Sequence, residues 1–270
     1  MAAVTVRTLK RKKTAGEPIV ALTAYDATTA MLEEQAGVDL ILVGDSMNMA
    51  VLGEETTLTA NLDVMLAHTR AVARGAPKTL VVGDMPFGSY ERSDSQAVKN
   101  AIRFLAEGSA HAVKLEGGNR MAISRVRAIV ESGIPVMGHL GLLPQSVRLS
   151  GGYRVVRREG LDRLLAEAAA LEEAGAFSIV LESVQEDVAA EVTAATSLPT
   201  IGIGAGREVD GQILVVNDML GLTPRFSPKF LKRYAELIPL IERALRDYAE
   251  EVRAGGFPGE EHVYGSKEAN

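Results

Sequence analysis

Eight short apolar segments, spaced along most of the chain, constrain its fold more than any other feature. They are residues 19–25, 40–44, 80–83, 112–116, 135–139, 177–182, 199–204 and 212–216, and they are rich in Val, Ile and Leu. They lack regular alternation with polar residues, which is typical of strands buried on both faces of a parallel sheet. Helical patterns lie between them, such as the segment that begins at Ser93, a predicted N-cap. The repeated strand-helix order predicts an α/β fold, a (β/α)₈ TIM barrel.

The length of 270 residues suits one large α/β domain, so we predict a single barrel domain over residues 1–270. A short helical segment is expected at 1–18, and a polar tail at 256–270. An apolar stripe predicts a long C-terminal helix from about Pro228 to Arg253. An open, doubly wound sheet is the alternative, but no glycine-rich dinucleotide-binding motif follows the first strand.

The composition limits which classes of partner the chain can bind. Its formal net charge is −6, which argues against a general nucleic-acid binder. The basic run at 10–13 is better interpreted as the end of a helix, where cations complement the helix dipole. Cysteine is absent, so disulfides and thiolate sites are excluded. No segment is long and apolar enough for a membrane span or a signal peptide. We therefore predict a cytoplasmic protein that binds neither membrane nor nucleic acid.

Polar and ionisable residues follow five consecutive predicted strands. They are Asp45 and Ser46 after the second, Asp84 after the third, Lys114 and Glu116 on the fourth, His139 on the fifth and Glu182 on the sixth. In a parallel barrel these strand ends meet at one face, where active sites are built. Any one Asp or Ser there could simply cap the following helix. Five strands in succession favour a functional site.

The residue types at this face indicate a metal. Carboxylates packed together repel one another unless a cation neutralises them. Oxygen donors, with no cysteine and a single histidine, favour Mg²⁺ over Zn²⁺, with Mn²⁺ as an alternative. Lys114 either pairs with a carboxylate or holds an anionic substrate. His139, taken alone, would more often be a structural residue than a ligand.

Several exact strings along nearly the whole chain then resemble one family. They are TAYD (23–26), VGDS (43–46), RGAP (74–77), KLEGG (114–118), GHLGLLPQS (138–146), GGY (151–153), GIGAG (202–206), DGQILV (210–215) and PGEEH (258–262). In this order they resemble the ketopantoate hydroxymethyltransferase family. The chain departs from the family pattern at Leu143, where Thr is common, and at RVVRREG (154–160). The resemblance therefore assigns no folate contacts within 143–160.

The resemblance implies transfer of a hydroxymethyl group from 5,10-methylenetetrahydrofolate to 3-methyl-2-oxobutanoate, giving 2-dehydropantoate in pantothenate biosynthesis. By matching motifs it implies Asp45, Asp84 and Glu116 as Mg²⁺ ligands, Asp45, Ser46, Asp84, Lys114 and His139 as substrate contacts, and Glu182 as the catalytic proton acceptor. It also implies a homo-oligomer, typically a decamer.

Elementary chemistry agrees with this implication. A 2-oxo acid can offer its carboxylate and keto oxygens to Mg²⁺, and a nearby carboxylate can remove the C3 proton. Two alternatives remain. The first is another Mg²⁺-dependent barrel lyase or mutase, acting on a 2-oxo acid or phosphoenolpyruvate without folate. The second is a barrel that binds a metabolite without turnover.

Overall fold

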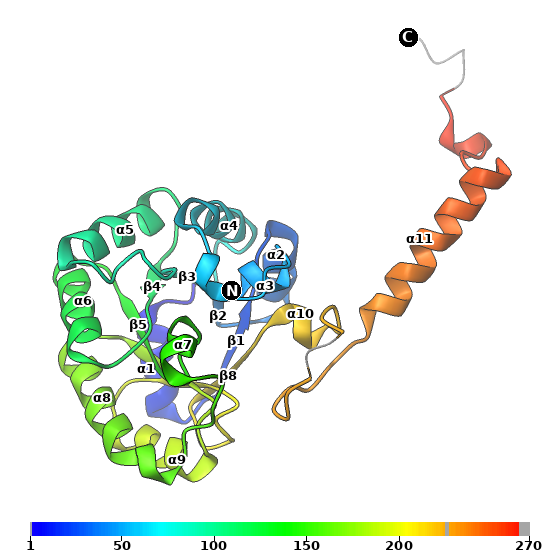
Figure 1. Ribbon diagram of the computed structural model, residues 1–270. Helices are drawn as coiled ribbons and strands as arrows, with labels where there is room; N and C mark the ends of the chain where they lie inside the picture. The colour runs from blue at the N-terminus through cyan, green and yellow to red at the C-terminus, as the bar shows by residue number, and fades with distance from the viewer. Residues whose placement is uncertain (1, 225–226, 265–270) are drawn as a thin grey trace. The chain divides into compact units, whose positions relative to one another are not determined.

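A computed structural model describes residues 2–224 and 227–264 of the chain. Within them, eight parallel strands close into a barrel in sequence order, and β8 pairs with β1 (Figure 1). The strands are β1 (Ile19–Thr23), β2 (Leu40–Val43), β3 (Leu80–Asp84), β4 (Ala112–Lys114), β5 (Val136–Gly141), β6 (Ser178–Glu182), β7 (Thr200–Ile203) and β8 (Gly211–Leu214). Each predicted apolar segment contributes one strand, so the predicted TIM barrel is confirmed and the open sheet is excluded.

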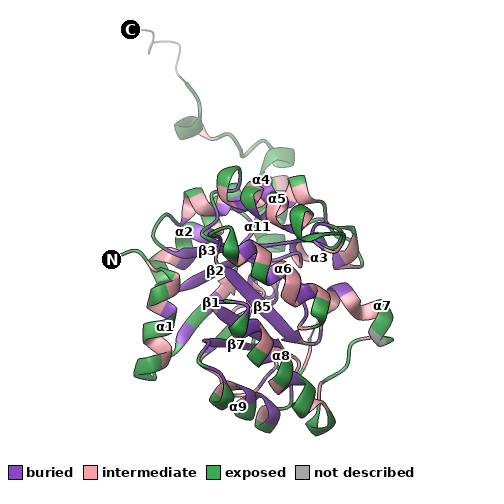
Figure 2. Cartoon of the chain, turned by 90° about the vertical axis from the view of Figure 1, so that its left-hand side faces the viewer, coloured by how far each residue is buried: buried purple, intermediate pink, exposed green. Residues whose placement is uncertain are grey.

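Helices surround the strands and cover their outer surface. They are α2 (Ala27–Ala36), α4 (Leu62–Gly75), α5 (Asp94–Ala106), α6 (Arg120–Glu131), α8 (Leu161–Glu173) and α9 (Glu186–Ala195). Shorter helical turns lie in the loops after β2 and β5, namely α3 (Met47–Ala50), η1 (Thr57–Thr59), η2 (Pro144–Ser146), α7 (Val147–Ser150) and η3 (Arg158–Gly160), and α10 (Val216–Met219) follows β8 in the sequence. The strands are buried and the helices expose their outer faces (Figure 2). Ser93 caps α5 as predicted, because its side chain accepts the backbone N–H of Gln96.

The interior of the barrel is filled by one face of each strand. This core contains Ile19, Ala21, Leu40, Leu42, Leu80, Val82, Ala112, Met137, Val180, Ile201 and Ile213, joined by Leu9. Because side chains alternate along a strand, a residue two positions after an interior residue also faces inward. Asp84 follows Val82 in this way, and Glu182 follows Val180. The same alternation that buries the core therefore carries polar groups into the mouth of the barrel.

The short helix α1 (Val6–Ala15) closes the other end of the barrel. Its Leu9 is fully buried among the interior residues. Lys12 pairs with Asp39 at 2.6 Å, and Lys13 pairs with Asp210 at 2.8 Å. The basic run is thus partly used to attach α1 to the segments just before β2 and β8. The predicted short N-terminal helix is confirmed and spans Val6–Ala15.

The chain divides into two compact units, Met1–Val216 and Asn217–Asn270. The second contains α11 (Leu237–Ala254) and the turn η4 (Glu260–His262). The prediction that the last helix begins near Pro228 is wrong, because the helix begins at Leu237. Pro239 stands in its first turn, where no intrahelical N–H bond is lost. One barrel domain over 1–270 stays a prediction, and residues 265–270 of the predicted tail lie outside the described part.

The helices of the described residues do not combine the length and the hydropathy that crossing a membrane requires.

Candidate active site at the carboxyl ends of the strands

The predicted site residues come together at one end of the barrel. The strand register places Asp84 directly opposite Lys114, and His139 opposite Val180, two residues before Glu182. Asp45 follows β2, whose last residue pairs with Gly83 of β3. Five of these residues are buried, with Asp45, Asp84, Lys114, Glu116 and His139 each 5% exposed or less.

On one side of the mouth, Asp45 and Asp84 share a small, crowded space. The backbone N–H of Asp45 donates to Oδ2 of Asp84 at 3.2 Å. The Lys114 ammonium donates to both oxygens of Asp84, at 2.7 and 2.8 Å. Burial and the neighbouring Asp84 raise the pKa of Asp45 to about 8. Burial also raises the pKa of Asp84, against the opposing effect of Lys114, and the two short contacts are those of an ion pair.

On the other side, His139 lies between two carboxylates. Its Nδ1 is 3.5 Å from Oε1 of Glu116, and its Nε2 is 3.3 Å from Oε2 of Glu182. Neither contact has the geometry of a hydrogen bond, so they are ion pairs at somewhat longer range. Burial and Lys114 oppose protonation of His139, but the two carboxylates raise its pKa to about 9. Burial acts to raise the pKa of Glu116, yet His139 and Lys114 bring it below the ordinary value.

Glu116 is placed differently from the expectation, and Ser46 lies at the edge of the site. Glu116 is not on a strand, because β4 ends at Lys114, although it remains in the buried cluster. Ser46 lies at the start of α3, and its hydroxyl is 2.9 Å from that of Tyr25. Ser46 therefore borders the mouth next to Asp45 and contacts none of the carboxylates through a hydrogen bond in the described residues.

Two further residues connect the two sides, and sequence reasoning missed both. The Gln145 side chain donates to Oδ2 of Asp45 at 2.9 Å, and its backbone N–H donates to Oε2 of Glu116 at 3.1 Å. The hydroxyl of Tyr90 donates to the Gln145 amide oxygen and accepts the backbone N–H of Glu116 at 3.4 Å. Gln145 lies inside the string GHLGLLPQS, so the motif itself was the available signal. Tyr90 had none.

The donor set can be tested against a divalent cation. In residues 2–224 and 227–264, no three carboxylate or imidazole groups already surround one point as a metal cage would. Mg²⁺ does not require a cage, because it commonly takes one or two carboxylates and completes its shell with water and substrate oxygens. Asp45 and Asp84 are two buried, mutually repelling carboxylates, and Oε1 of Glu116 is buried without a hydrogen-bond partner among the described residues. These groups fit a hard cation held mainly by Asp45 and Asp84.

The two sides of the mouth suit different chemistry. The side with Asp45, Asp84 and Lys114 offers charges that bind a cation and an anionic oxygen together. The side with His139 and Glu182 offers a carboxylate that is 22% exposed and oriented by an imidazolium. A carboxylate in that position can accept a proton from a molecule bound between the two sides.

The family model described as ketopantoate hydroxymethyltransferase matches residues 3–260 of the chain. A 3-methyl-2-oxobutanoate hydroxymethyltransferase from Desulfotalea psychrophila is 52% identical over 256 residues, covering 94% of this chain and 91% of that protein. The enzyme of the same name from Pseudothermotoga lettingae is 53% identical over 260 residues, covering 96% of each chain.

Solved structures with the same fold are more distant in sequence. Phosphonopyruvate hydrolase, solved with oxalate and Mg²⁺, has a TM-score of 0.63 at 16% identity, covering 98% of this chain and 93% of that one. A 2,3-dimethylmalate lyase of the PEP mutase/isocitrate lyase superfamily has a TM-score of 0.61 at 18% identity, covering 95% of this chain and 90% of that one. At this identity the likeness establishes the barrel fold alone.

Proposed function

Because the chain belongs to the ketopantoate hydroxymethyltransferase family, we propose that it transfers a hydroxymethyl group from 5,10-methylenetetrahydrofolate to 3-methyl-2-oxobutanoate. The product is 2-dehydropantoate, and we assign the reaction to pantothenate biosynthesis in the cytoplasm. The observation that carries this proposal is the arrangement of charges at the mouth, with the Asp84–Lys114 ion pair on one side and the His139–Glu182 pair on the other.

Asp45 and Asp84 would hold Mg²⁺, and Glu116 would contribute through a water molecule. When bound, the ion supplies Lewis-acid stabilisation of the negative charge that develops on the keto acid. The raised pKa of Asp45 supports this assignment, because burial and the neighbouring Asp84 disfavour its charged form, which a bound cation would favour.

The remaining residues bind and deprotonate the keto acid. Lys114, fixed by its two contacts with Asp84, supplies a positive charge for an anionic oxygen of the substrate. Ser46, beside Asp45, supplies a hydroxyl at the edge of the same space. Glu182 accepts the C3 proton. His139 lies between Glu182 and Glu116 and orients the Glu182 carboxylate.

We also propose that the chain assembles into a homo-oligomer, as the family resemblance implies, with a decamer as the specific form. Helix α11 supports association. It is amphipathic and has no buried residue, and its Leu240, Ile241, Leu245, Tyr248 and Val252 are 44–64% exposed. Apolar side chains repeated along one helix usually mark a contact surface. Light scattering that gives a monomer at micromolar concentration would contradict this.

Two measurements on the wild-type protein test the reaction. The first is formation of 2-dehydropantoate with Mg²⁺, with and without 5,10-methylenetetrahydrofolate. The second is exchange of the C3 proton of 3-methyl-2-oxobutanoate in D₂O without folate, which isolates the proton-accepting step. We expect product only with folate, and exchange without it. Product or cleavage without folate would favour the lyase or mutase alternative, which at present has only the shared fold in its favour.

A further inference from the structure

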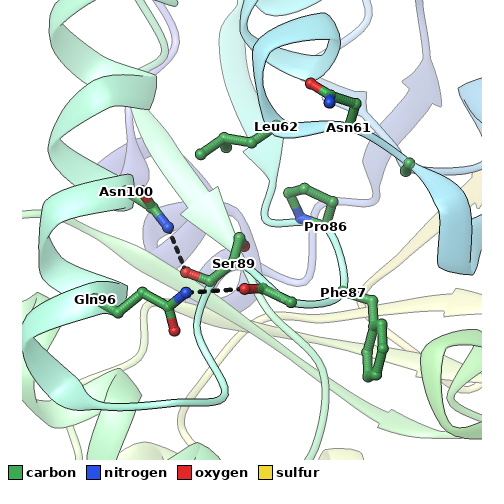
Figure 3. A pocket seen from close by; sticks show the side chains of 9 residues that line it. Asn61, Leu62, Pro86, Phe87, Ser89, Gln96 and Asn100 are labelled. Atoms are coloured by element: carbon green, nitrogen blue, oxygen red, sulfur yellow. Dashed lines mark hydrogen bonds between the residues drawn. The ribbon is translucent and has the colours of Figure 1, made fainter.

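A cavity of about 350 Å³ lies beside the mouth, between the loop after β3 and the beginnings of α4 and α5 (Figure 3). It is lined by Ala60, Asn61, Leu62, Pro86, Phe87, Gly88, Ser89, Gln96 and Asn100. This volume is at the lower end of the range typical for small-molecule sites. None of the residues assigned above to the keto acid or the metal lines it.

One wall of the cavity is attached directly to the active site. The loop 85–89 leaves β3 immediately after Asp84, and the backbone carbonyl of Met85 accepts a hydrogen bond from Gln145 at 3.1 Å. The loop returns at Tyr90, which binds Gln145 and the backbone of Glu116. Both ends of this loop therefore contact the site, and its middle residues, 86–89, form the cavity wall.

The lining is polar but carries no ionisable side chain. Asn100 donates to the carbonyl of Ser89 at 2.6 Å, and Gln96 donates to that of Gly88 at 2.9 Å, which fixes the loop (Figure 3). The Ser89 hydroxyl is buried and has no hydrogen-bond partner among the described residues. Phe87 is 49% exposed and offers an aromatic face. A buried hydroxyl without a partner costs free energy that a bound polar ligand would recover.

These features select the class of ligand. A phosphate or carboxylate is disfavoured, because a site for such anions ordinarily supplies Arg, Lys or a charged hydrogen-bond donor. An uncharged, flat heterocycle with donors and acceptors on its edge fits better, since it can pair with hydroxyl and amide groups and pack its face on an aromatic ring.

We propose that this cavity binds the pterin ring of the one-carbon donor, with the Ser89 hydroxyl on the polar edge of the ring and Phe87 against its face. The inference rests on the proposed function and locates the second substrate within it. The one-carbon unit is attached next to the pterin ring, so this ring must be bound close to the keto acid. The support for this closeness is the loop 85–89, which lines the cavity and contacts the site through Met85.

Two variants test the proposal with little risk to folding. Ser89→Ala removes a hydroxyl that makes no bond within the described protein, and Phe87→Ala truncates a half-exposed ring. Ser95→Ala is the matched control, because Ser95 is an exposed serine at the start of α5 that does not line the cavity. The readouts are KM for 5,10-methylenetetrahydrofolate, calorimetric Kd for tetrahydrofolate, and folate-independent exchange of the C3 proton.

We expect each variant to raise the folate KM and the tetrahydrofolate Kd about 5- to 20-fold, the size of one hydrogen bond or one stacking contact. Proton exchange and KM for the keto acid should stay within about twofold of the wild-type values, as should every readout of Ser95→Ala.

Unchanged folate KM and tetrahydrofolate Kd in both variants would overturn the inference and leave the proposed function standing. Equal losses in proton exchange and folate binding would also overturn it, because the cavity would then only support the site. If the wild type exchanges the C3 proton but makes no product with folate, the proposed function fails, and the inference fails with it.

Discussion

The barrel mouth and helix α2 each bury a carboxyl group whose pKa is raised to about 8, namely Asp45 and Glu33. Burial is the main cause in both. Their surroundings differ. Asp45 has a second carboxylate, an ammonium group and the Gln145 amide around it. Both oxygens of Glu33 lack a hydrogen-bond partner in the described residues. A perturbed pKa alone therefore does not identify a functional site, whereas a cluster of interacting charges does.

The two carboxyl groups also differ in whether a bound cation would change their ionisation. A divalent ion held by Asp45 and Asp84, as proposed above, would favour their ionised forms, so metal binding and protonation would be coupled there. Burial and, to a smaller extent, the charge of Asp26 raise the pKa of Glu33 to about 8, so it stays protonated near neutral pH. Substitutions at the mouth should consequently change activity, and substitution of Glu33 should change stability alone.

The largest effect is expected for Asp84→Asn. It removes a proposed metal ligand, and several kcal/mol of Lewis-acid stabilisation correspond to a loss of turnover on the order of 10⁴-fold. Calorimetric titration with Mg²⁺ and keto acid should show a matching loss of affinity. Unchanged Mg²⁺ affinity in a folded variant would remove Asp84 from the metal site.

This variant also leaves the buried Lys114 ammonium without its carboxylate, at a cost of about 3–5 kcal/mol of folding stability. Circular dichroism must therefore accompany the titration. The double variant Asp84→Asn/Lys114→Met removes the unpaired charge and serves as the folding control.

Glu182→Gln should retain Mg²⁺ and keto-acid binding but lose C3 proton exchange and turnover together, by roughly 10²–10⁴-fold. The amide keeps the shape of the side chain and cannot accept the proton. Exchange in D₂O followed by NMR measures the step directly, and Glu131→Gln, an exposed glutamate on α6, is the control. Exchange at the wild-type rate would assign the proton to another residue, with Glu116 or His139 acting through water next to test.

Gln145→Met tests whether the link between the two sides matters. The substitution removes the donor to Asp45 and the acceptor for Tyr90, while the backbone N–H that binds Glu116 remains. Groups that orient metal ligands typically contribute 10- to 100-fold, so we expect a loss of about that size in kcat/KM. Gln35→Met, an exposed position on α2, is the control. Wild-type kcat/KM would mean that Asp45 is held without Gln145.

We expect Glu33→Gln to have the smallest effect, because it should leave turnover unchanged. Since the folded pKa of about 8 lies above the ordinary 4.5, the carboxyl stabilises the folded state fully below pH 4.5, and this contribution is lost as the pH rises through 8. The variant should therefore be more stable than wild type by about 1–3 kcal/mol at pH 9. At pH 4.5 the two should be equal.

Urea unfolding at the two pH values measures this difference, with the exposed Glu17→Gln as the control. A stability difference that does not depend on pH would contradict the buried, protonated state of Glu33.

Much of the fold and the site could be predicted because both depend on local sequence. Apolar runs identify the strands, and the closed parallel order then brings their ends together, so Asp84 and Lys114 could be grouped before their contact was known. Gln145 and Tyr90 depend on how two loops fold back across the mouth, which no periodicity encodes. The start of α11 was misjudged because the apolar pattern continues upstream of Leu237. The metal, the substrates and the roles of the site residues stay predictions.

Helix α1 determines from which end of the barrel a ligand can reach the site. With Leu9 seated in the interior and two lysines bound to the surrounding segments, the amino-terminal end is shut. The proposed substrates would then share the mouth at the carboxyl ends of the strands. Lys114 and His139, predicted contacts of the keto acid, are almost fully buried, whereas Phe87 is half exposed at the rim. A folate analogue bound at this rim would cover the interior positions, so it should raise the KM for the keto acid, and steady-state inhibition kinetics would measure the change.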